Sequence, residues 1–520
     1  MITFAVLTGV VPKLGVVALA ALTSVALLAK EERTRAGAML AALVLAPALL
    51  LADIWNSPQL SIVHRHPLAA ALGAVLGLAA VIVAAAWLTR RTQLIGLLVV
   101  LALPFRVPIQ AGGTTSNLLV PLYLVIAAGS LAYLGPVLLP RWRSDTNSEP
   151  PSEPPSAAHA GRASVAARWL EPLLALYIVL YALQAMYSSY FEKALQQLVF
   201  FYVPFALLYC LLRRLKWTPR LLGSCLRAVV CLGLLFALVG FVEYATKTIF
   251  LNPKLIAAND VHAYFTVNSV FFDPDIFGRF LGLVMILLAG ALLYVRAPRD
   301  GLIVSAVLAV LWGGLVLTLS RSSMGALLVG LAVLAAIRWD ARRTVAAVAA
   351  VILLGVAAIA VSPKTFGLNQ GLNGASSGRA GLVSGGIDLF GQRPLWGYGS
   401  GSFVAEYQAH HPGSAGTLSA SHTIPITIAA EQGLIGEVVY LAVVLLALAR
   451  LLAGTRGDPA RAAVAAAFTA LVFHTLLYAD FLEDPVTWTL LGLGTAAALA
   501  PALPRQESPD IRAEAAAVPA

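Results

Sequence analysis

The sequence predicts an all-α, polytopic integral membrane protein with about 12–15 transmembrane helices and one long extracytoplasmic loop. Three observations support this fold class. Of the 520 residues, 59% are hydrophobic and only 12% are charged, whereas charged residues make up about 25% of soluble domains. The mean hydropathy is +0.85. Finally, apolar runs long enough to cross a membrane recur along the whole chain.

The individual spans are predicted from apolar runs of about 17–25 residues, the length that crosses a hydrocarbon core roughly 30 Å thick. About fifteen runs meet this length, near residues 5–29, 37–53, 67–88, 92–110, 117–139, 169–187, 194–212, 221–245, 276–295, 302–319, 322–337, 344–361, 422–449, 461–479 and 486–502. If these runs simply alternate in direction, the side of the membrane on which each connecting loop lies is fixed relative to the others.

Basic residues orient the predicted spans. Their clusters, for example Arg213 to Arg220 and Arg338 to Arg343, all fall on one side of the membrane if the runs alternate. By the positive-inside rule that side is cytoplasmic. The outer side then carries the loop 362–421 and a short break at Ser320–Ser323. We therefore expect the few basic residues on the outer side to have a specific role.

Charge and cysteine content argue against two other kinds of partner. The net charge of +10 comes from small clusters at the ends of apolar runs, without an extended basic patch, so no nucleic acid is expected. The three cysteines lie within or beside apolar runs and show no metal-type spacing. Neither a disulfide framework, nor a metal site, nor a cofactor is predicted.

The domain organisation follows from one change in composition. Residues 144–168 are rich in proline, serine and acidic residues, which predicts a disordered cytoplasmic linker. The linker separates N-terminal transmembrane helices in 1–143, which carry no candidate chemistry, from a transmembrane domain in 169–502 that contains the outer loop 362–421. The polar tail 503–520 is predicted to be disordered and cytoplasmic.

Arg321 is the first candidate functional residue. The apolar stretch Gly301–Ile337 would form a helix roughly 55 Å long, too long for one span, so it is predicted to form two spans with an outer turn at Ser320–Ser323. An arginine at membrane depth is costly unless it pairs or faces a wet cavity. The alternative is an arginine that reaches lipid headgroups from a helix end. The hydroxyls of Ser320 and Ser322 favour a binding role.

The outer loop supplies the second candidate, Arg379. It is followed by a segment with alternating glycines, Gly397, Gly399 and Gly401, which let a backbone approach a ligand closely. No Gly-Lys-Ser/Thr follows, so this is not a nucleotide loop. Two alternatives stay open: Arg379 as a solvated loop charge, and the glycines as an ordinary turn.

His422 is the third candidate, at the predicted start of an outer membrane helix. A neutral imidazole there can accept a proton from a hydroxyl, and two nearby arginines can hold a pyrophosphate through forked hydrogen bonds. Gly433 and Gly436, one turn apart, are expected to permit close helix packing. The alternative for His422 is a polar residue satisfied by the amides of a helix end.

At these residues the sequence resembles the O-antigen ligase and O-antigen polymerase superfamily. The ligase pattern is His, then Asn, Ser or Gln, nine residues, Gly, two residues and Gly. His422, Gly433 and Gly436 fit this spacing, while Thr423 departs from the second position. Leu317–Leu328 looks like the Ser-Arg turn that carries the family's first essential arginine, here Arg321.

Two further segments resemble the family. Ser377-Gly378-Arg379, with the later Pro394–Gly399, looks like the stretch that carries the second essential arginine. Asn268–Arg279 looks like a family segment at an outer helix start, where Asn often stands in place of Asp275. The resemblance covers about 260–450, and the extra N-terminal helices depart from a family that typically has about twelve.

The resemblance implies an enzyme that moves a glycan from undecaprenyl pyrophosphate to a hydroxyl acceptor at the outer face of the bacterial cytoplasmic membrane. We predict a metal-independent ligase or polymerase without a cofactor. Its donor would be a lipid-linked glycan on a polyprenyl pyrophosphate, and its acceptor a glycan, glycolipid or protein hydroxyl. The predicted catalytic residues are His422, Arg321 and Arg379, and the predicted substrate-binding residues are Ser320, Ser322, Arg279, Gly397, Gly399 and Gly401.

Two other classes of function remain open at this stage. A transporter or lipid-linked glycan flippase would place ionisable residues near the middle of several spans, often with internal repeats. A non-catalytic scaffold of an envelope assembly would use the linker as a docking segment.

Overall fold

The protein is a bundle of α-helices with one short β-hairpin in the part of the chain that the computed structural model describes. The described residues are 9–55, 60–111, 114–138, 164–250, 265–293, 297–339, 379–411 and 421–499, with short pieces at 255–256, 259, 342–344, 346–350 and 353. The elements are α1 (Val10–Leu28), α2 (Glu32–Ile54), α3 (Ser61–Arg65), α4 (Pro67–Thr89), α5 (Gln93–Ala102), β1 (Val107–Ala111), β2 (Thr114–Leu118), α6 (Val120–Leu138), α7 (Ser164–Ala185), α8 (Phe191–Gln197), a π-helix (Leu198–Tyr202), α9 (Val203–Leu212), α10 (Pro219–Thr246), α12 (Pro274–Leu292), α13 (Pro298–Leu317), α14 (Arg321–Arg338), α17 (Arg379–Gln392), α18 (Phe403–His410), α19 (Ile424–Leu452), α20 (Pro459–Thr475) and α21 (Pro485–Leu499).

The predicted fold class is confirmed. Eleven helices among the described residues are long and apolar enough to cross a membrane. Most predicted runs correspond to a helix, although α5, α20 and α21 are shorter than a full span. Most of the predicted linker, the tail 503–520, and most of the run 344–361 lie outside the described residues, as do 362–378 and 412–420 of the loop.

The predicted span 92–110 differs from the structure. Helix α5 ends at Ala102, and the chain continues into the antiparallel hairpin of β1 and β2, with Val107 paired to Leu118. Pro104 and Pro108 explain the early end, because each lacks the amide hydrogen that a continuing helix would need. Helix α7 also begins at Ser164, within the segment 144–168 that was predicted as linker.

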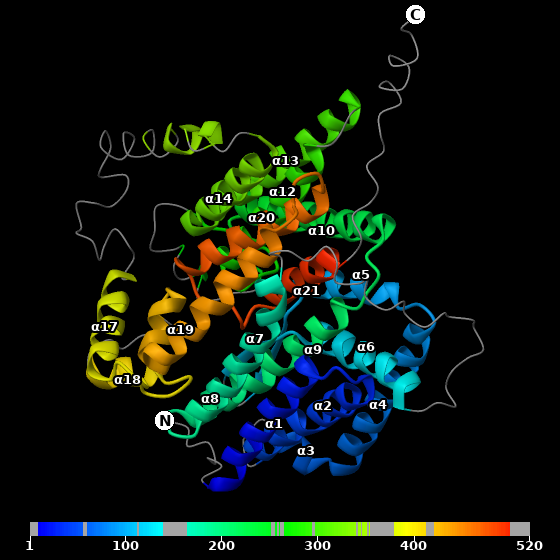
Figure 1. The fold of residues 1–520 in the computed structure, drawn as a ribbon, viewed down its shortest axis with the longest axis vertical. Coiled ribbons are helices and arrows are strands. Elements are labelled where there is room, and N and C mark those ends of the chain that lie inside the picture. The colour runs from blue at the N-terminus through cyan, green and yellow to red at the C-terminus, as the bar shows by residue number, and fades with distance from the viewer. Residues whose placement is uncertain are drawn as a thin grey trace, which may run out of the picture.

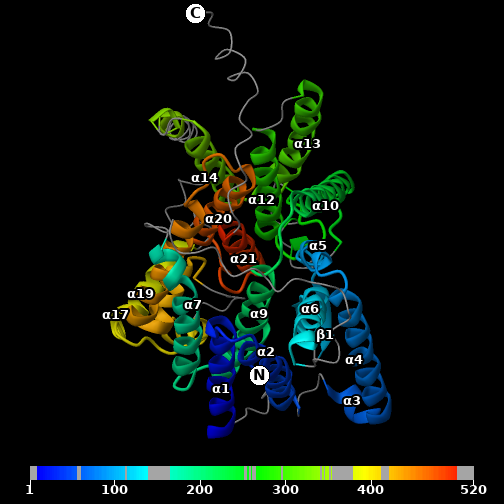
Figure 2. The ribbon, with the colours of Figure 1, turned by 45° about the vertical axis from the view of Figure 1, so that its right-hand side comes forward.

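The helices form two connected groups, which Figures 1 and 2 show from two directions. Helices α1, α2, α4 and α6 (blue to cyan) pack together, while α12, α13, α14 and α20 form the second group. Helices α7 and α9 join the groups, because α1 packs on both of them, α7 packs on α19, and α9 packs on α21. The N-terminal helices therefore support the elements that surround the candidate site.

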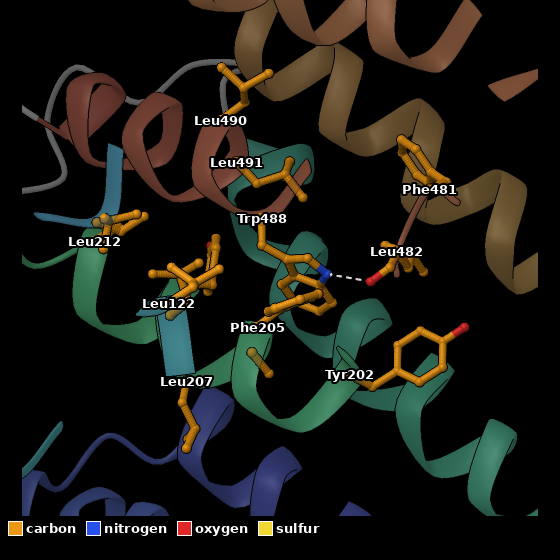
Figure 3. Packing of buried hydrophobic residues seen from close by; sticks show 14 of the residues in the cluster. Leu122, Tyr202, Phe205, Leu207, Leu212, Phe481, Leu482, Trp488, Leu490 and Leu491 are labelled. Carbon is orange, nitrogen blue, oxygen red and sulfur yellow. Dashed lines mark hydrogen bonds between the residues drawn. The ribbon is translucent and has the colours of Figure 1, made fainter. Parts of the chain in front are cut away.

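Trp488 of α21 anchors the centre of the bundle. Its side chain is fully buried, its indole nitrogen donates a hydrogen bond to the Leu482 carbonyl at 2.8 Å, and its ring meets Tyr209 edge-on. Figure 3 shows the indole between α21 and the π-helix with α9, near Phe205 and Tyr202. A buried indole with a satisfied N–H fixes the short segment between α20 and α21 against the core.

Helix α19 is kinked at Gly433, whose φ of 66° and ψ of −166° are not helical. A neighbouring loop supplies the hydrogen bonds that the kink removes from the helix. The Gly399 amide donates to the Glu431 carbonyl at 2.7 Å, and the Leu434 amide donates to the Pro394 carbonyl at 2.7 Å. The glycine-rich segment is thus bonded along its backbone to α19.

The glycines differ from their expected roles. A Cβ on Gly433 would lie 2.4 Å from the Leu395 carbonyl carbon, so this glycine admits the loop backbone rather than a neighbouring helix. A Cβ on Gly397 would meet the Glu431 carbonyl at 2.3 Å, and one on Gly399 would meet the Ser188 backbone at 2.4 Å. The glycine backbone does make close approaches at these positions, but it approaches other backbone segments of the protein.

Substitution of Gly433 tests this close approach. Gly433→Ala should destabilise the protein more than Gly457→Ala, because both positions have φ in the left-handed region but a Cβ at Gly457 meets nothing within 4 Å. Backbone strain alone costs about 1–2 kcal/mol. Thermal unfolding of the two purified variants in detergent gives the comparison. Equal loss of stability would show that the loop can move away from α19 without cost.

Candidate active site

The candidate site forms where α12, α14 and α17 begin. Asp273 caps α12, and its side chain accepts a hydrogen bond from the Asp275 amide at 2.7 Å. Pro274 occupies the first turn, where a missing amide hydrogen costs nothing. This cap fixes the Asp275 carboxylate in the first turn of α12, a position where the helix dipole favours a negative charge.

The predicted break between two spans is present. Helix α13 ends at Leu317 and α14 starts at Arg321, with Ser320 as the N-cap that accepts from the Ser323 amide at 3.2 Å. The hydroxyl of Ser320 also donates to Asp275, and that of Ser322 donates to the same oxygen at 3.1 Å. The two serines flanking Arg321 are therefore held by one carboxylate, and the Arg321 side chain is exposed beside them.

Arg379 is the first residue of α17 and binds the same carboxylate. Its guanidinium pairs with the second oxygen of Asp275 at 3.1 Å and donates to the Leu477 carbonyl at 3.1 Å. About a third of the side chain is exposed (35%), so it is oriented by Asp275 without being enclosed. Asp275 thereby links the start of α14 to the start of α17.

His422 lies just before α19 and is half-buried. Its backbone has a φ of 58°, and its ring packs against the Tyr478 ring at 5.7 Å between centroids. The Nδ1 atom is buried and has no hydrogen-bond partner among the described residues. Burial and then the charge of Arg379 lower the pKa of the imidazole, with Asp275 opposing this shift. The imidazole is thus favoured in its neutral form, which can accept a proton.

The three predicted catalytic residues have different relations to the Asp275 carboxylate. Arg379 binds Asp275 directly, Arg321 stands between two serines that bind it, and His422 is close enough to feel the charges of both Arg379 and Asp275. The arrangement places two guanidinium groups and one neutral imidazole at a shared set of helix starts.

Arg279 has a different environment from the one predicted. It is only 4% exposed, and its guanidinium forms an ion pair with Asp484 at 2.8 Å and donates to the Asp480 carbonyl at 3.3 Å. A buried arginine requires such a partner, because an unpaired charge would be very costly there. These contacts join α12 to the segment that precedes α21.

Sequence reasoning missed two residues of this site, Tyr478 and His474. The Tyr478 ring contacts both histidine rings, with centroids 5.7 Å apart for His422 and 5.5 Å apart for His474. The Nε2 atom of His474 lies 3.2 Å from the Ser323 hydroxyl. Both residues lie at the end of the apolar run 461–479, and two polar rings there are the signal that could have identified them.

An apolar cavity of about 310 Å³ lies next to the Arg279–Asp484 pair. Helices α10, α12, α20 and α21 supply its walls, with Val229, Phe280 and Leu283 among the lining residues. No group of three or more side chains suited to a metal ion occurs in the described part of the chain.

Fold and site together define a class of protein: a polytopic membrane protein with two arginines and a histidine at one set of helix starts, beside an apolar cavity. Residues 304–441 match the family model described as O-antigen ligase, and this segment contains Arg321, Arg379 and His422. The match supports the resemblance of this segment to the O-antigen ligase and polymerase superfamily, and the eleven long apolar helices among the described residues indicate a multi-pass membrane protein. Neither a curated protein nor a solved structure matches the chain.

The electrostatic effect of Arg379 and Asp275 on His422 can be measured without an activity assay. Arg379→Gln should raise the pKa of His422, because it removes a positive charge, and Asp275→Asn should lower it, because it removes a negative one. Since diethyl pyrocarbonate modifies only the neutral imidazole, the pH dependence of His422 modification, followed by mass spectrometry, reports this pKa. Arg393→Gln, at an exposed arginine of the same loop, is the control. Shifts in the same direction for both variants would contradict the arrangement.

Proposed function

We propose that the protein transfers a glycan from a polyprenyl pyrophosphate carrier to a hydroxyl acceptor at the outer face of the cytoplasmic membrane. The observation that carries the proposal is that Asp275 binds Arg379 and both serines that flank Arg321, and that its charge acts on His422. The basic clusters of the sequence support the outer position of these helix starts, since they occupy the opposite ends of the spans.

The two arginines would bind the pyrophosphate. A guanidinium offers paired N–H donors that match phosphate oxygens, and it keeps its charge at any physiological pH. Asp275 holds Arg379 in place while leaving part of the side chain exposed. Arg321 begins α14, where the positive end of the helix dipole adds to the attraction for an anion.

His422 would take the proton of the acceptor hydroxyl. As the hydroxyl oxygen bonds to the anomeric carbon of the donor, the bond from that carbon to the pyrophosphate oxygen breaks, and the hydroxyl proton moves to the imidazole. The polyprenyl pyrophosphate leaves with the electron pair, and the arginines stabilise its charge. Burial and Arg379 both favour the neutral imidazole that this step requires.

The apolar cavity would hold the part of the polyprenyl chain next to the pyrophosphate. Its lining is almost entirely hydrophobic, and Arg279 and Asp484 mark one of its ends. Apolar surface of this kind suits a hydrocarbon chain, because burying each CH₂ group contributes about 0.8 kcal/mol.

The clustering of ionisable groups at helix starts favours transfer over transport. Asp275, Arg321 and Arg379 all lie in the first turn of their helices. A transport path would place such groups near the middle of several spans.

Alanine substitutions test the assigned roles. His422→Ala should reduce glycan transfer about 10²–10⁴-fold, because a general base is lost. Arg321→Ala and Arg379→Ala should each reduce it about 10²–10³-fold through lost charge stabilisation. Transfer is measured in membranes supplied with a lipid-linked donor. Arg456→Ala serves as the control, because Arg456 is exposed in the loop between α19 and α20. Normal transfer by well-expressed site variants would overturn the assignment.

A bulky residue in the apolar cavity tests its role as the lipid site. Val229→Trp, in the cavity wall of α10, should raise the KM for a long-chain polyprenyl donor more than for a short-chain analogue. Leu238→Trp is the matched control, because Leu238 is exposed on the other face of the same helix. Equal effects of the two substitutions on both donors would remove this cavity from the donor site.

A further inference from the structure

A second cavity, of about 470 Å³, adjoins the candidate active site. It lies between α7, α8, the π-helix and the start of α19. Ile424 and Thr427 of α19 line it, as does Asp480, which follows Tyr478 by two residues. His422 lies two residues before α19, its ring contacts Tyr478, and the charge of Asp480, a lining residue, acts on its imidazole.

Tyrosines form one wall of the cavity. Tyr177 and Tyr181 come from α7, and Tyr202 comes from the π-helix. The Tyr181 and Tyr202 rings are 4.6 Å apart, and those of Tyr177 and Tyr202 are 5.9 Å apart. Figure 3 shows Tyr202 near Leu482, which also lines the cavity. A π-helix within a membrane helix is uncommon and frequently marks a functional position.

Polar groups are held in place around this aromatic wall. Glu483 accepts hydrogen bonds from the Gln197 amide at 3.0 Å and from the Tyr202 hydroxyl at 3.3 Å. Glu431 accepts from the Gly401 amide at 2.8 Å, which ties the glycine-rich segment to the cavity. Gly401 itself lines the cavity.

Most of the charged groups that line this cavity are acidic, whereas Arg321 and Arg379 are basic. Three carboxyl groups, of Glu431, Asp480 and Glu483, line the cavity together with one ammonium group, of Lys193. Among the described residues no ion pair joins Lys193 to these carboxyl groups. An anionic ligand such as a pyrophosphate is therefore disfavoured here, while a ligand rich in hydroxyl groups can both donate to carboxylates and stack on tyrosine rings.

A sugar hydroxyl can form a hydrogen bond with Glu483 whether its carboxyl group is ionised or protonated. Burial, with Asp480 and Glu431 close by, raises the pKa of its carboxyl group. A sugar hydroxyl can donate to the ionised form and accept from the protonated form. An anionic sugar gains a hydrogen bond only from the protonated form.

We propose that this cavity binds the sugar ring that carries the acceptor hydroxyl, and that its acidic lining selects uncharged or amino sugars over uronic acids and phosphorylated sugars. The assignment of this sugar as acceptor rests on the proposed function, whereas the binding preference itself does not. Donor pyrophosphate and acceptor sugar would thus occupy separate sites.

Direct binding tests the cavity without catalysis. Saturation-transfer NMR on the full-length protein in nanodiscs should detect maltopentaose or a glucosamine pentamer, and binding of a galacturonate pentamer should be at least tenfold weaker. Glu483→Gln should weaken binding of the neutral or amino oligosaccharide about tenfold and reduce the discrimination against the galacturonate. Glu31→Gln and Tyr244→Phe, at exposed residues outside the cavity, are controls. Failure to bind either preferred probe, or equal binding of the galacturonate, would overturn the inference.

Kinetics separate this inference from the proposed function. Glu483→Gln and Tyr202→Phe should raise the KM for the acceptor about tenfold and change the KM for the lipid-linked donor less than twofold. Transfer by the wild type with unchanged acceptor KM in both variants would contradict the acceptor site alone. Selective sugar binding without any transfer by the wild type would contradict the proposed function alone.

Discussion

The Asp275 carboxylate is the interaction on which the candidate site depends. It receives hydrogen bonds from Ser320 and Ser322 and an ion pair from Arg379, so one side chain of α12 fixes the starts of both α14 and α17. The end of α20 contributes as well, because Ser323 contacts His474 and Arg379 donates to the Leu477 carbonyl. The negative charge of Asp275 pairs with the Arg379 guanidinium, of which about a third of the side chain (35%) stays exposed.

The kink of α19 is the second constraint, and it shapes the space around His422. Gly433 interrupts the helix, and the loop that contains Gly397 and Gly399 replaces the lost backbone hydrogen bonds. Glu431, two residues before Gly433 and in the wall of the second cavity, accepts hydrogen bonds from the amides of Gly401 and Phe403. The glycines therefore act through the architecture, because they allow backbone segments to meet where a Cβ could not fit.

Much of the fold was predictable because a bilayer permits few solutions for an apolar chain. The length of the 301–337 run required a break at Arg321, the position of His422 at the start of an apolar run marked that residue, and the outer loop with its glycine-rich segment marked Arg379. The contact partners of individual residues were not predictable. Sequence alone could not show that Arg279 is neutralised by the distant Asp484, or that Gly433 faces a loop. His474 and Tyr478 were overlooked because the run 461–479 was read for its length and hydropathy, although two polar rings at its end were a visible signal.

The most direct test of the central claim is a cryo-EM structure of the protein in nanodiscs with a non-transferable polyprenyl pyrophosphate glycan. The account predicts pyrophosphate density within hydrogen-bond distance, about 3 Å, of the Arg321 and Arg379 guanidinium groups, with the anomeric carbon toward His422. Pyrophosphate density in the second cavity, between α7, α8 and the start of α19, or at a basic residue remote from Asp275, would contradict it.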